Sequence, residues 1–244
     1  MAAAVLGVLL LGGPALAAEA IHLTTGMREP WTTAERSGFT DLLVRELFRR
    51  LGRDGTVEFN GASARALSLA DLGTDDGLAA RVAGLDKEYP NLIRVPEKIF
   101  DNDFVAGSEG PAVATDRWEA MAPFSVAYII GWQIFEHNLP KVRELTMAKD
   151  SRQLLTLLKS GKVEMVLHER WQLLWHARAL GMQVRIHEPP LARVPMYLYL
   201  NRRHAELIAP ISRELAAMKA DGTYDRLAAQ AFAGLGGGRT PLFH

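Results

Sequence analysis

The sequence contains no cysteine. This absence excludes disulfide bonds, a thiolate nucleophile, and zinc or iron–sulfur sites built on cysteine. It also excludes anchoring through a lipidated N-terminal cysteine. Lys and Arg together number 28, as do Asp and Glu, so the chain lacks the basic excess typical of nucleic-acid-binding proteins. We therefore expect no nucleic acid among its partners.

Long hydrophobic runs are also absent. A membrane-spanning helix needs about 20 apolar residues, whereas the longest run, residues 2–11, stops at Gly12-Gly13-Pro14. Ala15-Leu16-Ala17 then has the small-x-small pattern of a signal-peptidase site. We expect residues 1–18 to be an export signal, although no Lys or Arg precedes the run; the alternative is a buried N-terminal helix. The mature chain is expected in the periplasm and not embedded in a membrane.

No catalytic motif stands out. The seven histidines show no HExxH or other paired metal spacing, and neither Gly-x-Ser-x-Gly nor a phosphate-binding loop is present. We therefore expect no metal, no cofactor and no enzymatic activity.

What is present is an alternation of strand and helix patterns. The 244 residues, 48% of them apolar and 23% charged, are typical of a globular protein. Apolar periodicity and Gly or Pro stops predict strands at 21–25, 56–59, 77–80, 92–95, 104–106, 125–130, 144–148, 163–167, 184–186 and 196–200. They predict helices at 38–51, 62–72, 132–138, 151–159 (capped by Ser151), 171–180, 205–219 and 224–232. This order predicts an α/β protein made of two blocks.

Five segments, taken in order, resemble one family. They are Gly26–Trp31, Gly38–Leu42 with Arg50-Leu51-Gly52, Leu72–Gly77, Leu157–Glu164 and Met218–Tyr224. Together they resemble the first ligand loop, the Gly-x-x-Asp turns and the Lys-x-Asp-Gly-Thr-Tyr ending of bacterial extracellular solute-binding proteins of family 3. Members of that family are periplasmic receptors of amino-acid ABC transporters, and this chain looks like a divergent one.

The resemblance implies a two-lobe periplasmic-binding-protein-like fold, each lobe a mixed sheet flanked by helices. The first lobe would comprise 19–107 plus 197–244, and the second 108–196. A small ligand, such as an amino acid, would bind in the cleft between the lobes, and a monomer would deliver it to the permease of an ABC transporter. Two alternatives remain. One is a receptor for a different, for example apolar, ligand that serves a sensor or another transport system. The other is a dehydratase-like enzyme with Glu29 or Glu169 as its acid.

The resemblance also implies charged ligand contacts. In the family an Arg on the first lobe clamps the ligand carboxylate, a role that suits the planar fork of a guanidinium. Arg81 is the nearest candidate here and Arg65 the second; the alternative for both is a surface charge. The family's acid for the ligand ammonium falls on Glu169. The alternative for Glu169 is a helix N-terminal charge stabilised by the helix dipole.

The remaining candidates for ligand contact are one turn and three side chains, and one pair of tryptophans is expected in the core. Gly131-Trp132 resembles the family's second ligand turn, and Trp31 and Tyr128 would add aromatic faces. Trp132 and Tyr128 could equally be core residues. Glu29 would bind a cation or lie exposed. Trp171 and Trp175 are four residues apart on one expected helix, and this spacing predicts that both are buried.

Overall fold

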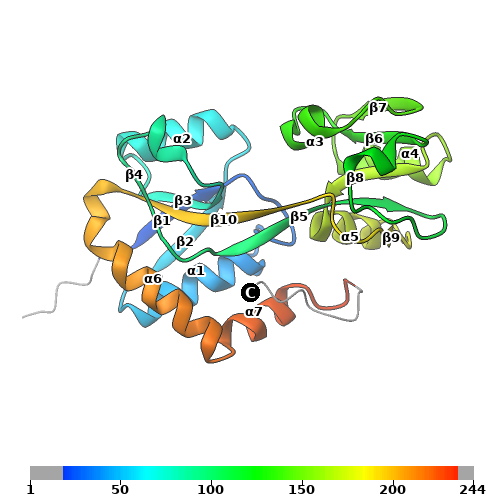
Figure 1. Cartoon of the computed structure of the whole chain (residues 1–244). Coiled ribbons are helices and arrows are strands. Elements are labelled where there is room, and N and C mark those ends of the chain that lie inside the picture. Colours follow the sequence, from blue (N-terminus) through cyan, green and yellow to red (C-terminus); the bar gives the residue numbers. More distant parts are fainter. Residues whose placement is uncertain (1–18, 236–244) are drawn as a thin grey trace, which may run out of the picture.

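The computed structural model describes residues 19–235. The expected export signal at 1–18 and the end of the expected first lobe, 236–244, lie outside the described residues. Figure 1 shows two groups of elements joined by two long strands, and we call these groups the first and second lobes.

The first lobe contains β1 (Ile21–Thr25), α1 (Phe39–Arg50), β2 (Gly55–Phe59), α2 (Ser63–Leu72), β3 (Gly77–Arg81), β4 (Leu92–Arg94), α6 (Ala205–Ala220) and α7 (Thr223–Ala231). The second lobe contains β6 (Ser125–Ile129), α3 (Gln133–Asn138), β7 (Glu144–Ala148), α4 (Ser151–Lys159), β8 (Met165–Glu169), α5 (Arg170–Ala179) and β9 (Arg185–Ile186). The connecting strands are β5 (Phe100–Ser108) and β10 (Ala192–Asn201).

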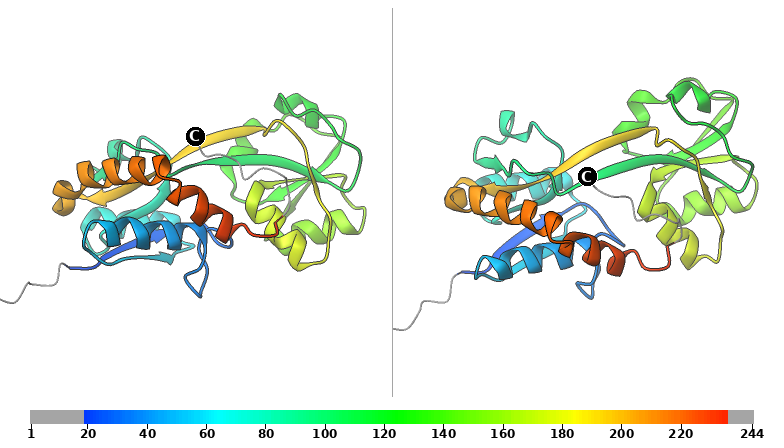
Figure 2. Two further views of the ribbon diagram at one scale, coloured as in Figure 1. Left: turned by 90° about the horizontal axis from the view of Figure 1, so that it is seen from below. Right: turned by 60° about the horizontal axis from the view of Figure 1, so that its bottom comes forward.

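The strand order is β2-β1-β3-β10-β5-β8-β6-β7, with β4 added on β10 and β9 on β5. Within the first lobe β1 runs parallel to β2 and β3, and within the second lobe β6 runs parallel to β7 and β8. The two connecting strands pair antiparallel with each other, from Phe100 opposite Met196 to Phe104 opposite Ala192. This two-stranded ribbon is the link between the lobes, as Figure 2 also shows.

Strand register determines which ends face the ribbon. Arg81, the last residue of β3, lies opposite Tyr197, just beyond the ribbon on β10. Glu169, the last residue of β8, lies opposite Phe104, at the other end of the ribbon on β5. The carboxyl ends of the parallel strands in both lobes therefore point toward the ribbon from opposite sides.

The predicted α/β class is confirmed, and two local predictions need correction. β5 and β10 are longer than the expected 104–106 and 196–200, because their mutual pairing brings polar residues such as Asp101 and Asn102 into a strand. Ser151 is not the cap of α4: the carboxylate of Asp150 accepts the N–H of Gln153 at 2.8 Å, and Ser151 is the first helical residue. The expected lobe boundaries at 107/108 and 196/197 fall inside the connecting strands and stay predictions.

One apolar core extends from the first lobe to α5 of the second. The apolar face of α1, with Phe39 and Leu43, packs into this core, as do buried residues of α6 and α7. Trp171 joins the same core by stacking on Phe232, with ring centroids 4.4 Å apart. Trp171 is buried as expected, whereas Trp175 is only partly buried. Figure 2 shows the chain after α7 leading toward α5. The lobes are thus joined by packing as well as by the ribbon.

Within residues 19–235, no helix has both the length and the apolar character required to cross a membrane.

The close approach of β3 to β10 requires glycine at position 77. A Cβ at Gly77 would overlap the carbonyl oxygen of Tyr199, and this backbone cannot move away without breaking the pairing. We predict that Gly77→Ala lowers the free energy of unfolding by about 2 kcal/mol or more, measured by urea denaturation. Gly110→Ala is the control, because its Cβ would lie 3.6 Å from the Ser108 hydroxyl and should change stability by less than about 0.5 kcal/mol. Equal effects of the two substitutions would contradict this reading of the sheet.

Candidate functional site

In open α/β sheets, ligands bind beyond the carboxyl ends of the strands. At this edge of the first lobe the chain leaves β1 at Gly26 and β3 at Arg81. A Cβ at Gly26 would lie 3.2 Å from Nη1 of Arg81, so the guanidinium lies directly against this glycine. The same Nη1 is 3.4 Å from the hydroxyl of Ser63, the first residue of α2, to which it donates. The loop after β1 and the start of α2 therefore enclose Arg81.

The charge of Arg81 is poorly compensated. Its Nε and Nη2 are buried and have no hydrogen-bond partner among the described residues, and Arg81 forms no ion pair with them. Burial lowers the pKa of the guanidinium from its ordinary value, but arginine stays charged in proteins. A buried charge without a partner is costly. An anion that reached the guanidinium would supply acceptors for these nitrogens.

A local distortion of β3 precedes Arg81. Ala80 has φ = 61°, a left-handed conformation that is unusual for alanine. The pairing with β10 shifts register between Tyr197 and Tyr199, opposite this point. Such bulges redirect the side chain that follows. The distortion thus sets the direction of Arg81.

The facing edge of the second lobe carries the turn after β6. Gly131 has φ = 84°, and its N–H donates to Glu136 Oε1 at 2.8 Å. Trp132 is half-buried, stacks on Phe135 and leans on His168 with centroids 4.6 Å apart. The turn is therefore held by internal contacts, and Trp132 forms an aromatic surface at this edge.

Beneath Trp132 lies a buried Ser–His pair. His168 Nδ1 donates to the carbonyl of Glu169 at 3.1 Å, so Nε2 accepts from the hydroxyl of Ser151 at 2.8 Å. Burial, with a smaller contribution from nearby His176, lowers the pKa of His168 to about 3. A base this weak is a poor proton acceptor at neutral pH, and the pair acts as a neutral support for the turn.

Glu169 has internal partners. Its Oε1 accepts the N–H of Trp171 at 3.0 Å, and its Oε2 accepts the N–H of Gln172 at 2.9 Å, so it is the N-cap of α5. Oε2 also accepts the indole N–H of Trp31 at 2.9 Å. Only 1% of Glu169 is exposed. Burial raises its pKa to about 7, against the opposing effect of the three donors.

Trp31 comes from the first lobe and is fully buried. Its ring stacks on Phe100 with centroids 4.0 Å apart and meets Phe232 edge-on at 5.3 Å. The structure thus brings together Trp31 and Glu169, two residues expected to contact ligand, and bonds them to each other. They are 138 positions apart in the sequence, and the sequence carries no signal for this pairing.

The two remaining expected site residues are Tyr128 and Glu29. Tyr128 is 5% exposed and packs against Phe135 within the second lobe's apolar core, which fits its alternative as a core residue. Glu29 is half-buried on the loop after β1. The charges of Glu29 and nearby Arg28 act in opposite directions on the pKa of His176 of α5, which burial lowers.

Sequence reasoning missed an ion-pair network across the ribbon. Asp103 on β5 is 5% exposed and accepts from Arg193 on β10 at 2.7 and 2.9 Å and from Arg170 at 3.2 Å. Arg170 also bonds Glu188 through two atoms, at 2.6 and 3.0 Å. The network fixes the ribbon to the start of α5, because Arg170 opens that helix directly after Glu169.

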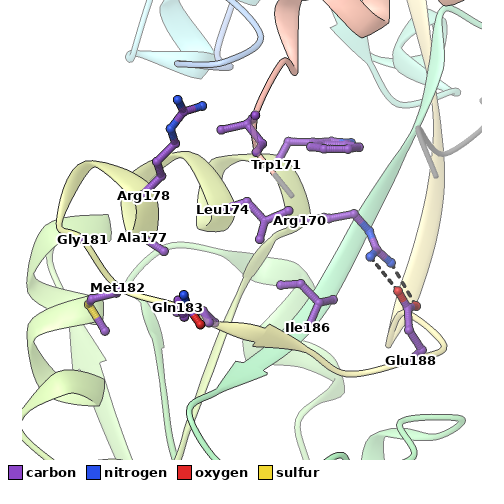
Figure 3. Close-up of a pocket in the computed structure, with 13 residues that line it drawn as sticks. Arg170, Trp171, Leu174, Ala177, Arg178, Gly181, Met182, Gln183, Ile186 and Glu188 are labelled. Carbon is purple, nitrogen blue, oxygen red and sulfur yellow. Dashed lines mark hydrogen bonds and ion pairs between the residues drawn. The ribbon is translucent and has the colours of Figure 1, made fainter. Parts of the chain in front are cut away.

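A separate pocket of about 740 Å³ runs along α5 and is shown in Figure 3. Its lining includes apolar Leu174, Ala177 and Ile186, and none of the expected site residues contributes to it. Arg170 and Glu188 at its edge are already paired with each other. Within the described residues, no group of three or more His, Asp or Glu side chains is arranged to hold a metal ion.

No family model matches the chain. An uncharacterised protein of Shewanella oneidensis is 24% identical over 79% of this chain and 75% of that protein. The chain is similar to an ancestral cationic amino-acid solute-binding protein, with a TM-score of 0.70, 17% identity, and 87% and 95% of the two chains covered.

Two further solved structures are also similar. The second substrate-binding domain of a putative amino-acid ABC transporter from Streptococcus pneumoniae has a TM-score of 0.68 and 16% identity, covering 88% of this chain and 100% of that one. The glutamate-bound GluR0 ligand-binding core from Nostoc punctiforme has a TM-score of 0.64 and 18% identity, covering 87% and 99%. The chain has the periplasmic-binding-protein fold. At these identities the likeness shows the fold alone.

The raised pKa of Glu169 predicts a pH-dependent stability. An acid whose pKa rises on folding, here from 4.5 to about 7, is more protonated in the folded state, so stability falls as pH rises through this window. Glu169→Gln removes that titration. We predict that the stability of the variant relative to the original chain improves by about 2 kcal/mol between pH 5 and pH 8.

The measurement is urea denaturation of both proteins at the two pH values. Other titrating groups are common to both chains and cancel in the difference. A difference that stays constant with pH would show that Glu169 is ionised throughout and would contradict its buried, poorly solvated position.

Proposed function

We propose that this chain is an exported solute-binding protein, a divergent relative of family 3, that captures a small ligand between its two lobes. The proposal rests above all on Arg81. This cation is held at the carboxyl edge of the first lobe with two buried, unsatisfied donors, and a ligand carboxylate matches that fork geometrically and electrostatically.

The facing edge of the second lobe would complete the site. Gly131 and Trp132 lie at the carboxyl end of β6, which points toward the ribbon as the end of β3 does. In this proposal the carboxylate contacts Arg81 and the body of the ligand lies against Trp132. Glu29 lies on the loop after β1 and, in this proposal, does not contact the ligand. Trp31, Tyr128 and Glu169 support it from within and do not touch the ligand.

Delivery to an ABC transporter is the role that we favour. Similar structures include substrate-binding proteins of amino-acid ABC transporters, and the apolar run before residue 18 suits export. In this proposal residues 1–18 are removed, the protein acts in the periplasm as a monomer, and an inner-membrane permease receives the ligand. The proposed lobe boundaries are those inferred above, near 107/108 and 196/197.

A sensory role is the second candidate. A histidine kinase sensor domain with similarity to periplasmic binding proteins matches this chain with a TM-score of 0.63 and 18% identity, covering 88% of this chain and 96% of that one. The two roles share the ligand site and differ in the partner. Crosslinking of the ligand-loaded protein in its own cells would separate them, since a permease would be captured in one case and a sensor kinase in the other.

The ligand site is tested by removing its cation. We predict that the chain binds at least one member of a panel of aliphatic and aromatic carboxylates, and that Arg81→Gln weakens this binding by about 30-fold or more, since a buried charge pair is lost. Isothermal titration calorimetry measures both affinities.

Arg65→Gln is the matched control. Arg65 is exposed on α2, close in sequence to Ser63 but at the surface, and its loss should leave the affinity unchanged. The proposal fails if no carboxylate in the panel binds, or if Arg81→Gln binds as tightly as the original chain.

A further inference from the structure

The buried charged groups at the two facing edges differ in whether they have hydrogen-bond partners. This difference indicates which charged groups a ligand should carry. The inference drawn from it rests on the proposed function, because it concerns the same site. Arg81 offers buried donors without acceptors. The question is whether any carboxylate at either edge is left to receive a ligand ammonium.

Glu169 is the buried acid of the second lobe and is already engaged. Two backbone N–H groups and the indole N–H of Trp31 use its oxygens. To reach it, an ammonium would have to displace Trp31 from its stack on Phe100. The raised pKa of Glu169 further reduces its negative charge near neutral pH. It is therefore a poor partner for a cation.

The other acids near these edges are exposed or half-buried. Asp150 caps α4 through Gln153 and is exposed. Glu136 accepts the N–H of Gly131 and is exposed. Glu29 is half-buried on the loop after β1, so a Glu29→Gln variant tests its role directly. None of their carboxylate oxygens is both buried and without a hydrogen-bond partner, whereas Nε and Nη2 of Arg81 are.

Exposed apolar residues follow or precede the candidate residues of both edges in the sequence. Val82 follows Arg81 directly and is 44% exposed, and Ile130 precedes Gly131 and is 58% exposed. Trp132 adds a half-buried ring. A ligand placed between the edges would thus meet one cation and mainly apolar surface, where an ammonium would lose water without gaining a partner.

We propose that the ligand is an organic carboxylate with an apolar body and no ammonium group, so that the site favours a deaminated acid over the amino acid with the same side chain. The basis is the contrast between the unpartnered buried Arg81 and the internally bonded Glu169.

The test uses matched pairs of compounds. The probes are 4-methylpentanoate against L-leucine and 3-phenylpropanoate against L-phenylalanine, each pair differing only in the amino group. Phenethylamine serves as the amine without a carboxylate. We expect the full chain to bind at least one deaminated acid at least about tenfold more tightly than its amino acid in calorimetry, and not to bind phenethylamine.

Two variants assign the result. Arg81→Gln should abolish binding of the deaminated acid, and Glu29→Gln should leave the preference for it unchanged. Tighter binding of the amino acid, or equal affinities within a pair, would overturn the inference; if that binding still required Arg81, the proposed function would stand. A preference that first appears in Glu29→Gln would overturn the inference by identifying Glu29 as the ammonium partner. Absence of binding by every carboxylate, with or without an amino group, would overturn the inference and the proposed function together.

Discussion

The hydrogen bond from the Trp31 indole to Glu169 connects buried residues from opposite lobes. The carboxylate also caps α5, so the same side chain fixes where the second lobe's last helix begins and where the first lobe's loop ends. Around it, Trp31 stacks on Phe100 and Trp171 on Phe232, and one apolar core results. This contact, together with the apolar core around it, fixes the relative position of the two strand edges, since the ribbon alone is only two strands wide.

This arrangement has an electrostatic consequence. Burial makes the Glu169 carboxylate costly to ionise, and three donors satisfy the charge that it carries. Arg81 is in the opposite situation: its Nη1 donates to the Ser63 hydroxyl, but its Nε and Nη2 have no acceptor among the described residues. In our proposal the site between the edges therefore binds anions in preference to cations. The ion pairs of Asp103 with Arg170 and Arg193 hold the ribbon beside it. They leave Nε and Nη2 of Arg81 without a partner among the described residues.

Local sequence patterns predicted most of the fold, because helices such as α1 and α4 have clear apolar periodicity and glycine stops. The ribbon was only partly predicted. Asp101 to Asp103 are polar and adopt a strand through pairing with β10, which no local pattern encodes. The position of Arg81 at a strand end followed from the sequence. Its lack of partners, and the bond between Trp31 and Glu169, depend on tertiary contacts between distant segments, and so sequence reasoning assigned Trp31 and Glu169 to the ligand.

The most direct measurement is a crystal structure of the protein with a bound carboxylate. Our account predicts the ligand carboxylate within hydrogen-bond distance of Arg81 Nε and Nη2, the ligand body against Trp132, and the Trp31–Glu169 bond intact. A ligand in the pocket along α5, or a Glu169 side chain turned away from Trp31 to contact the ligand, would contradict it.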